Sequence, residues 1–413
     1  MGIIYNFIIQ IIQIILHFLK YFNSNIKEFI YERKDVFKDL KLNISNNQKY
    51  IWIHVASLGE YEQGFPVFNK IKSLYNDHKI VISFFSSSGY NVRKLNPISD
   101  LTVYLPIDTA KNANKFLDLL KPKMVFFVKY EFWPNFLKSL KNRNIPTYLI
   151  AGIIRENHWF FNFYGLWMKK YLKAFHHFFV QNESSKNILI KQKFTNCTVM
   201  GDSRYDRVID LPKQNNEIKY LNNFKGNKKC FVAGSSWEKD ESLIIKFINS
   251  YKKNDVCFII APHQINLNRI NELKQLITKN TILISELAKS NAINPEVIII
   301  DSIGLLTKVY SYADIAYVGG GMGNTGLHNT LEPAVFKIPV IIGNNFEKFP
   351  EVKELIDLKG IISVNNIKSF TDELNALLNS KEKRDQIGNI NYEYINAKLG
   401  AYKKVINYLK EKK

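Results

Sequence analysis

Glu60 is an acidic residue placed where a predicted strand turns into a predicted helix. Residues 51–55 form an apolar, β-like run, residues 57–59 form a small Ser-Leu-Gly turn, and a helical pattern starts at Glu60. A glutamate in the first turn of a helix most often serves as a capping charge. The same setting also lets Glu60 be a chemical group that is aimed into a cleft. In either role the helix amino terminus should lower the pKa of Glu60.

Two more charged side chains follow strand-like runs in the same half of the chain. Glu131 comes just after a strand predicted over 124–129 and beside a helix predicted over 133–141. Arg204 follows a strand-like run and precedes a polar segment, and arginine can neutralise a phosphate through two parallel hydrogen bonds. The alternatives are a first-turn helix acid for Glu131 and a surface ion pair between Arg204 and Asp206.

A glycine-rich loop is the strongest candidate for a phosphate site. A strand predicted over 315–318 leads into three glycines at 319–321, and glycines let the backbone approach a ligand closely. Asn329 or Thr330 could cap the helix that follows, and the free N–H groups of its first turn would favour a phosphate. Glu332 in that turn could accept hydrogen bonds from ribose hydroxyls. The alternative is that the loop is only a turn.

Two other strand ends carry polar groups. Residues 232–241 repeat the pattern of a strand, a small-residue turn and a helix, which suits a phosphate. His263 follows a strand predicted over 256–260, but a lone histidine is more often structural than catalytic.

The sequence has no His-x-x-Glu helix or carboxylate cluster, so we expect no essential metal. The three cysteines lack C-x-x-C spacing and are expected to be buried, reduced thiols.

Two series of alternating strands and helices predict two doubly wound α/β domains. The first series, within residues 46–210, has strands predicted at 50–55, 79–85, 101–105, 124–129, 147–151 and 178–180. The second, within residues 229–390, has strands predicted at 229–233, 256–260, 281–284, 297–300, 315–318 and 339–342. This βαβ rhythm is typical of parallel sheets covered on both faces. Residues 211–228 are predicted to be a linker, and residues 391–413 a closing helix.

Length and charge agree with this organisation. A chain of 413 residues suggests two domains. Two doubly wound domains facing a cleft would present strand carboxyl ends and helix amino termini to it, which suits nucleotides and phosphates. The formal net charge of +20 and the pI near 9.5 favour anionic partners. The sequence has no zinc-finger spacing or RNA-binding aromatic signature, so nucleic acid is not a favoured partner.

The amino-terminal residues 1–45 are predicted to form an apolar helix followed by a basic segment. Within residues 2–22 the polar positions fall on one narrow stripe of a helix, namely Asn6, Gln10, Gln13, His17 and Lys20. The length would just span a bilayer, whereas the stripe suits a helix lying in the interface. A buried core helix is the alternative. The basic, amphipathic residues 27–41 would face anionic headgroups, which predicts anchoring to the cytoplasmic leaflet of a membrane.

The ordered set of these motifs resembles one family, the 3-deoxy-D-manno-octulosonic acid (Kdo) transferases of Gram-negative lipopolysaccharide synthesis. Any one motif is weak, but the set follows the family's order over most of the chain. The segments are WIHVASLGEYEQGFP (52–66), ISFFSSSGY (82–90), YLPID (104–108), KYEFWPN (129–135), GDSRYDRV (201–208), VAGSSWEKDE (232–241), YADIAYVGGG (312–321) and HNTLEPA (328–334).

The resemblance implies an inverting glycosyltransferase of the GT-B type at the cytoplasmic face of the inner membrane. Its amino-terminal domain would hold a lipid A precursor and its carboxyl-terminal domain CMP-Kdo, with no cofactor besides this co-substrate. Glu60 matches the family's general base, and Glu131 matches a second motif glutamate with a transition-state role. Arg204 matches a basic residue that is often lysine.

The resemblance also implies a CMP site, which comprises Pro262, His263, Gly304, Leu305, Leu306, Asn329, Thr330, Leu331 and Glu332. Many family members have Pro-Arg where this chain has Pro262-His263, so the contact with phosphate or cytidine differs there. Two alternatives remain open. One is another membrane-associated GT-B transferase that uses a UDP-sugar, and the other is a non-catalytic nucleotide-binding scaffold at the membrane.

Overall fold

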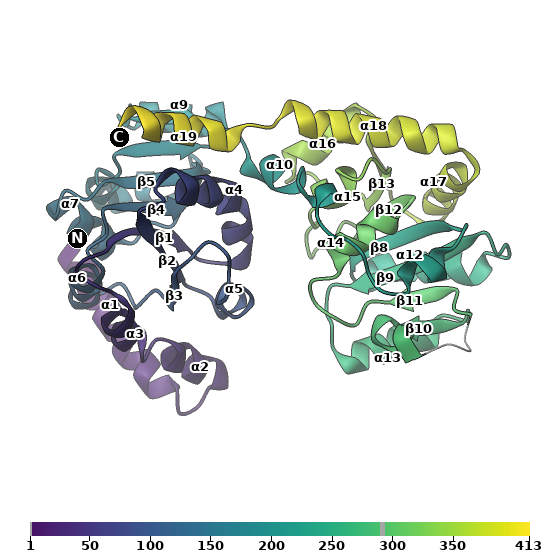
Figure 1. Cartoon of the computed structure of the whole chain (residues 1–413), viewed down its shortest axis with the longest axis horizontal. Helices are drawn as coiled ribbons and strands as arrows, with labels where there is room; N and C mark the ends of the chain where they lie inside the picture. The colour runs from purple at the N-terminus through teal and green to yellow at the C-terminus, as the bar shows by residue number, and fades with distance from the viewer. Residues whose placement is uncertain (1, 290–293) are drawn as a thin grey trace. The chain divides into compact units, whose positions relative to one another are not determined.

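The computed structural model describes residues 2–289 and 294–413. The chain divides into two compact units. Unit 1 comprises Met1–Arg207 and Gly400–Lys413, and unit 2 comprises Val208–Leu399. Each unit is a parallel sheet with helices packed against it (Figure 1).

Unit 1 is built on a seven-stranded sheet in the order β3-β2-β1-β4-β5-β6-β7. Its strands are rich in apolar residues that are buried, as expected for a parallel sheet covered on both faces. The strands are β1 (Lys49–Val55), β2 (His78–Phe84), β3 (Leu101–Tyr104), β4 (Met124–Val128), β5 (Thr147–Gly152), β6 (His177–Val180) and β7 (Cys197–Val199). The helices are α1 (Gly2–Leu19), α2 (Ser24–Glu32), α3 (Val36–Asn43), α4 (Leu58–Leu74), α5 (Ser87–Arg93), α6 (Ala110–Leu120), α7 (Pro134–Asn142), α8 (Lys169–Leu172), α9 (Glu183–Lys191), α10 (Ser203–Val208) and α19 (Ala401–Glu411), with 3-10 turns η1 (Trp159–Phe161) and η2 (Phe163–Met168).

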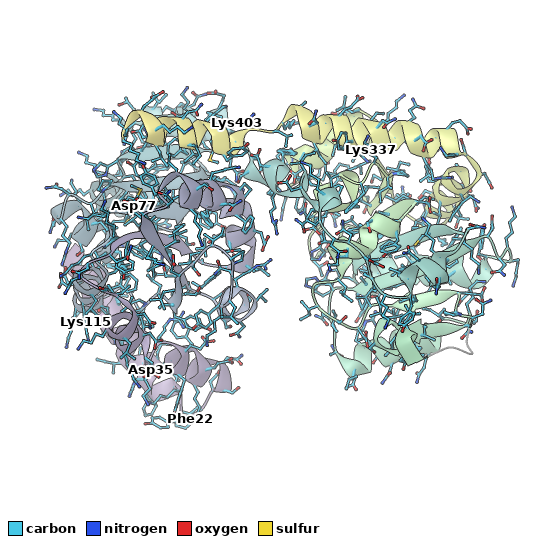
Figure 2. The ribbon with its side chains drawn as sticks, viewed as in Figure 1. Phe22, Asp35, Asp77, Lys115, Lys337 and Lys403 are labelled. Atoms are coloured by element: carbon cyan, nitrogen blue, oxygen red, sulfur yellow. The ribbon has the colours of Figure 1, made fainter. Side chains whose placement is uncertain are left out.

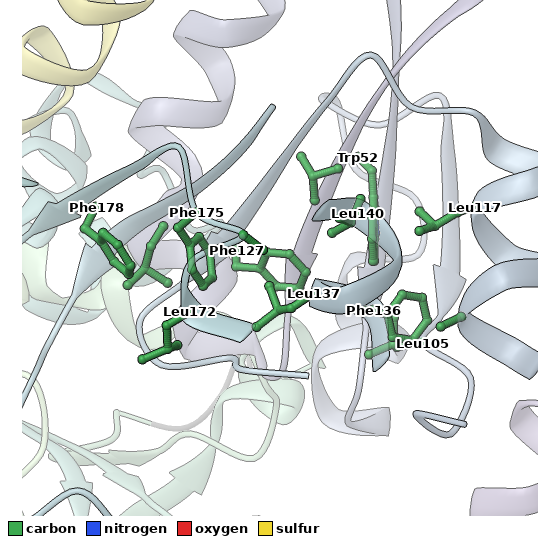
Figure 3. Close-up of a cluster of buried hydrophobic side chains, with 14 of the residues drawn as sticks. Trp52, Leu105, Leu117, Phe127, Phe136, Leu137, Leu140, Leu172, Phe175 and Phe178 are labelled. Atoms are coloured by element: carbon green, nitrogen blue, oxygen red, sulfur yellow. The ribbon is translucent and has the colours of Figure 1, made fainter. Parts of the chain in front are cut away.

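The side chains of β1 show how helices cover both faces of this sheet. Trp52 points to one face, where its ring centroid lies 5.4 Å from that of Phe136 on α7. Figure 3 shows these two rings in one cluster with Phe127 of β4. Ile51 and Ile53 point to the opposite face and pack with α4 and α19. Because α19 lies beside α4, the carboxyl-terminal helix completes the core of unit 1 (Figure 1).

Unit 2 has a second seven-stranded parallel sheet, in the order β10-β11-β9-β8-β12-β13-β14. Its strands are β8 (Lys229–Ser236), β9 (Val256–Pro262), β10 (Thr281–Leu283), β11 (Val297–Ile299), β12 (Ile315–Val318), β13 (Val340–Gly343) and β14 (Ile361–Val364). Its helices are α11 (Leu221–Lys225), α12 (Glu238–Ser250), α13 (Leu267–Leu276), α14 (Leu306–Val309), α15 (Leu331–Ala334), α16 (Pro350–Asp357), α17 (Ile367–Asn379) and α18 (Lys381–Ala397), with 3-10 turns η3 (Leu211–Lys213), η4 (Ile284–Lys289) and η5 (Tyr310–Tyr312).

Helix α1 is docked on unit 1 near its amino-terminal end. The hydroxyl of Tyr5 donates a hydrogen bond of 2.8 Å to the buried carboxylate of Asp108, and its ring lies 5.5 Å from that of Trp167. Most apolar side chains of α1 are nevertheless exposed, namely Ile4, Phe7, Ile8, Ile11, Ile12, Ile14, Ile15, Phe18 and Leu19. The alternative of a buried core helix is therefore wrong for α1.

The polar stripe of α1 faces the two helices that follow it. Gln13, His17 and Lys20 line a groove of about 410 Å³ together with residues of α2 and α3. Figure 2 shows Phe22 in the turn between α1 and α2 and Asp35 just before α3, and both side chains are exposed.

By length and composition, no single helix in the described part of the chain is able to cross a membrane. The stretches Ile4–Leu19 and Ser24–Asn43 are long and apolar enough only when taken as a pair, and the pair is bent by 119° at the break between them.

The structure contains every predicted strand, with ends that differ by at most three residues. The predicted series omit β7 and β14. Residues 211–228 pack as part of unit 2, because Leu221 is fully buried in its core. Residues 391–413 form the end of α18 and all of α19, and only α19 belongs to unit 1.

Candidate active site

The candidate site of unit 1 lies where the strand order of the sheet reverses. Strands β1 and β4 are neighbours, but the helices that follow them, α4 and α7, pack against opposite faces of the sheet. In doubly wound sheets the carboxyl ends of two such strands flank a crevice in which ligands bind. Glu60 follows β1 and Glu131 follows β4, so the fold brings these two predicted residues to this place.

Glu60 lies in the first turn of α4, where its carboxylate folds back over the preceding turn. Ser57 is the N-cap residue, and Oε2 of Glu60 accepts the backbone N–H of Ala56 at 2.5 Å. Glu60 is only 4% exposed. Burial and the nearby carboxylate of Glu131 raise the pKa of Glu60 to about 7, although the N–H of Ala56 and the ammonium of Lys129 act to lower it. The backbone N–H groups around the helix amino terminus lower the pKa of Glu60, as predicted, but desolvation has the larger effect and the net shift is upward.

Glu131 is held by a network of polar and aromatic side chains. Its Oε2 accepts the indole N–H of Trp133 at 3.0 Å and lies 3.5 Å from Nε2 of His54. His54 is a fully buried residue of β1, and its Nδ1 lies 2.8 Å from Oγ of Ser83 on β2. Because α7 begins at Pro134, Glu131 lies outside its first turn, and the alternative of a first-turn helix acid is wrong. His54 carries no signal in the sequence that marks it as a site residue.

Lys129 and Asp202 complete a group of charges in unit 1. Lys129 follows the last residue of β4, and burial lowers its pKa whereas Glu60 raises it. Arg204, Asp202 and Glu131 are also near enough to act on that pKa. The charged cluster is the name used here for Glu60, Lys129, Glu131, Asp202 and Arg204. In the sequence, the only signal of Lys129 and Asp202 is a position after a strand, and neither is a predicted site residue.

Arg204 joins the charged cluster as the partner of a carboxylate on its own loop. Its Nη2 lies 2.7 Å and its Nε 2.8 Å from Oδ2 of Asp202. The alternative pair with Asp206 is wrong, since Asp206 instead accepts the backbone N–H of Gly400 at 2.7 Å. Although β7 is the edge strand, the loop after it is tied to α4, because the amide of Gln63 donates to Asp202 at 3.3 Å.

The candidate site of unit 2 lies at the corresponding reversal, between β8 and β12. Asp240, near the start of α12, accepts the N–H of Gly320 at 2.8 Å and the hydroxyl of Tyr317 at 2.7 Å. A Cβ added to Gly319 would come within 2.3 Å of the carbonyl oxygen of Ser235. Gly319 is therefore needed to pack this loop against the end of β8. Asp240 is not among the site residues predicted from the sequence.

His263 belongs to a stack of three aromatic rings in unit 2. Pro262 ends β9, and the N–H of His263 donates to the carbonyl of Ser236 at 2.9 Å. The imidazole stacks on the rings of Trp237 and His328, with centroids 4.5 Å and 4.4 Å away. Burial and the neighbouring His263 lower the pKa of His328. The stack holds the otherwise exposed His263 in one orientation.

Three further residues of the predicted CMP site surround the start of α14. Gly304 has a φ of +89° in the loop before this helix, Leu305 is its N-cap residue and Leu306 its first residue. The hydroxyl of Thr307 then donates to Oε2 of Glu332 at 3.3 Å. This contact brings α14 next to α15 and so unites two segments that are distant in the sequence.

The remaining predicted residues form the start of α15, which is only four residues long. Asn329 caps this turn, since its Oδ1 accepts the N–H of Leu331 at 3.2 Å. Its amide also donates to Oε1 of Glu332 at 3.1 Å. Thr330 makes no side-chain cap, and its buried hydroxyl oxygen has no hydrogen-bond partner among the described residues.

Within residues 2–289 and 294–413, no group of three or more His, Cys, Asp or Glu side chains is arranged to hold a metal ion. The three cysteines are free and buried, which confirms their prediction.

Known proteins are similar to this chain in sequence and in fold. Residues 30–207, which include the whole charged cluster, match the family model described as 3-deoxy-D-manno-octulosonic-acid transferase (kdotransferase). The 3-deoxy-D-manno-octulosonic acid transferase of Haemophilus influenzae is 29% identical over 379 residues, which cover 87% of this chain and 86% of that protein. A bifunctional glycosyltransferase/methyltransferase of Fusobacterium nucleatum is 28% identical and matches 95% of this chain, which spans 62% of its length.

A solved glycosyltransferase from Rickettsia africae has the same fold, with a TM-score of 0.59 and 15% identity over 88% of this chain and 98% of that one. The two parallel seven-stranded sheets are thus those of a GT-B architecture. The match over residues 30–207, which lie in unit 1, shows that this part of the chain is similar to the 3-deoxy-D-manno-octulosonic acid transferases.

Proposed function

We propose that this protein transfers Kdo from CMP-Kdo to a lipid A precursor, with Glu60 as the general base. The observation that carries the proposal is a buried glutamate with a pKa near 7, inside the segment that matches the family. A base is most effective when its pKa lies near the working pH, because it is then both deprotonated and able to hold a proton. The proposal is also supported by the relative from Haemophilus influenzae, which is named a 3-deoxy-D-manno-octulosonic acid transferase.

In the proposed mechanism, Glu60 takes the proton of a primary hydroxyl on the acceptor's glucosamine disaccharide. The hydroxyl oxygen attacks the anomeric carbon of Kdo, and CMP leaves from the opposite face with the bonding electron pair, so the configuration inverts. The carboxylate of Glu131 would stabilise the positive charge that develops on the sugar ring. The guanidinium of Arg204 would neutralise the departing phosphate.

Unit 2 would hold the CMP moiety of the donor. The carboxylate of Glu332 can accept hydrogen bonds from ribose hydroxyls. The side chain of Asn329 and the loop at Gly304 lie on the same side of the sheet, because Glu332 links their two segments. His263, fixed by its aromatic stack, would take the role that arginine has in many family members.

The raised pKa of Glu60 predicts a specific pH dependence of transfer. Only the carboxylate form accepts a proton, so kcat/KM should fall about tenfold per pH unit below about pH 7. A pH–rate profile of the purified protein measures this fall in kcat/KM, which is the acidic limb of the profile. A limb near pH 4.5, the ordinary pKa of a glutamate, would contradict the proposed burial of the base.

The choice of nucleotide separates this function from that of a UDP-sugar transferase. We expect CMP to raise the melting temperature of the protein by several degrees, because a ligand that binds only the folded state stabilises it. UDP at the same concentration should leave the melting temperature unchanged. Protection by UDP but not by CMP would favour the alternative donor.

We also propose that α1 anchors the protein to an anionic membrane surface, where the lipid acceptor lies. Its apolar side chains are exposed, whereas the basic groups of its polar stripe face the neighbouring groove. The double variant Phe7→Glu/Phe18→Glu should move most of the protein from the membrane fraction to the soluble fraction. A matched control, Leu267→Glu/Leu276→Glu, places the same charges on exposed leucines of α13 and should stay with the membranes. Equal partitioning of the two variants would contradict the anchoring role.

A further inference from the structure

Lys129 is a half-buried lysine with an unusual backbone conformation. Its φ is +59°, in the left-handed region that glycine adopts freely and other residues adopt only with strain. Its backbone N–H donates to the carbonyl of Ile150 on β5 at 3.0 Å, so the sheet fixes this conformation. Strained residues gather at functional sites, where the surrounding structure holds them in place.

The ammonium of Lys129 lies among acids that are bound to other groups. Within the described ranges, no carboxylate oxygen lies within 4.0 Å of its Nζ, although Glu60, Asp202 and Glu131 are near enough to raise its pKa. Each of these acids already accepts a hydrogen bond, from a backbone N–H, a guanidinium and an indole N–H respectively. The three N–H donors of the ammonium thus remain for a ligand.

We propose that Lys129 forms an anion subsite beside Glu60 and that this subsite binds an oxyanion of the sugar donor. This inference rests on the proposed Kdo transfer. The donor carries two such groups, the carboxylate of the sugar acid and the phosphate that joins it to cytidine. A lysine binds either group as a compact point charge with three donors. By holding the donor beside the base, Lys129 places the reacting carbon within reach of the acceptor hydroxyl.

The test replaces Lys129 by asparagine, which lacks the charge but tolerates a left-handed backbone. We expect the KM for CMP-Kdo to rise about 10- to 100-fold, because a hydrogen bond to a charged group is lost. Lys129→Arg should restore much of the affinity. The matched control is Lys123→Asn, which removes an exposed lysine next to the other end of β4 and should leave the KM unchanged.

Inhibition by CMP, which has the phosphate but no sugar carboxylate, identifies the group that is bound. If Lys129→Asn weakens CMP-Kdo but not CMP, the subsite holds the carboxylate, and if both are weakened alike, it holds the phosphate.

An unchanged KM for CMP-Kdo, or a rise confined to the lipid acceptor, would overturn the inference. The inference would also be overturned if Lys129→Asn only moved the acidic limb of the pH–rate profile to higher pH and kcat/KM reached the wild-type value above that limb. Lys129 would then act only as a positive charge that, together with Arg204, offsets the negative charges of Glu60, Glu131 and Asp202. Absence of transfer by the unmodified protein would instead refute the proposed function itself.

Discussion

Replacing Glu60 by glutamine should lower the rate of sugar transfer by about 10²–10⁴-fold, the usual contribution of one positioned base. Glutamine has the size of glutamate, and its carbonyl oxygen can still accept the N–H of Ala56. It cannot accept the proton of the attacking hydroxyl. We therefore expect kcat to fall while the KM for CMP-Kdo stays within a few-fold, as measured by steady-state kinetics with purified protein.

The same substitution should make the folded protein more stable at alkaline pH. The pKa of Glu60 is raised to about 7 in the folded state, so the unfolded chain loses this proton first, and stability is lost as pH rises from about 4.5 to about 7. Glutamine removes that loss, which is about 3 kcal/mol above pH 7. Thermal melts should show Glu60→Gln more stable than the wild type at pH 8 and no different at pH 4.

Glu62→Gln is the matched control on the same helix. Glu62 is a more exposed acid that pairs with Arg93 and Arg207 rather than with the charged cluster. Its variant should keep transfer within a few-fold of the wild type. If Glu60→Gln kept as much activity as this control, Glu60 would not be the base.

Replacing Asp240 by alanine should destabilise unit 2 by about 3–4 kcal/mol, because several buried donors would lose their acceptor together. The buried carboxylate accepts the N–H groups of Trp237, Gly320 and Met322 and the hydroxyl of Tyr317. Without it, the glycine loop after β12 should lose its fixed position. We expect denaturant unfolding to show the loss of stability, and CMP to lose its thermal protection even where the protein is still folded.

Asp255→Ala is a suitable control in the same unit. Asp255 is exposed, pairs with Lys229 at 3.3 Å and accepts the hydroxyl of Tyr251 at 2.8 Å, and an exposed ion pair contributes about 1 kcal/mol or less. Equal destabilisation by the two variants would show that Asp240 is not the group that holds the glycine loop.

The sequence predicts the strands of both sheets well, because parallel strands buried on both faces are continuous apolar runs. It omits β7 and β14, which are edge strands of three and four residues with polar members such as Thr198 and Ser363. The return of α19 to unit 1 is not visible in the sequence either. An amphipathic helix shows that it has an apolar face but not which sheet this face covers.

The candidate site could be predicted in part. Glu60 and Glu131 are recognisable because they directly follow strands that lie at the centre of the sheet. Lys129 and Asp202 escape prediction because their role depends on neighbours from other strands, and the pairing of Arg204 with Asp202 depends on the path of one loop. The sign of the pKa shift of Glu60 also depends on burial, which overrides the local effect of the helix.

Mass spectrometry of a lipid IVA-type acceptor incubated with CMP-Kdo and the purified protein tests the proposed function most directly. We predict that the wild-type protein adds one or more Kdo residues to the acceptor, whereas Glu60→Gln adds about 10²–10⁴-fold less in the same time. No gain in mass with the wild-type protein, or an equal gain with both proteins, would contradict Kdo transfer by Glu60.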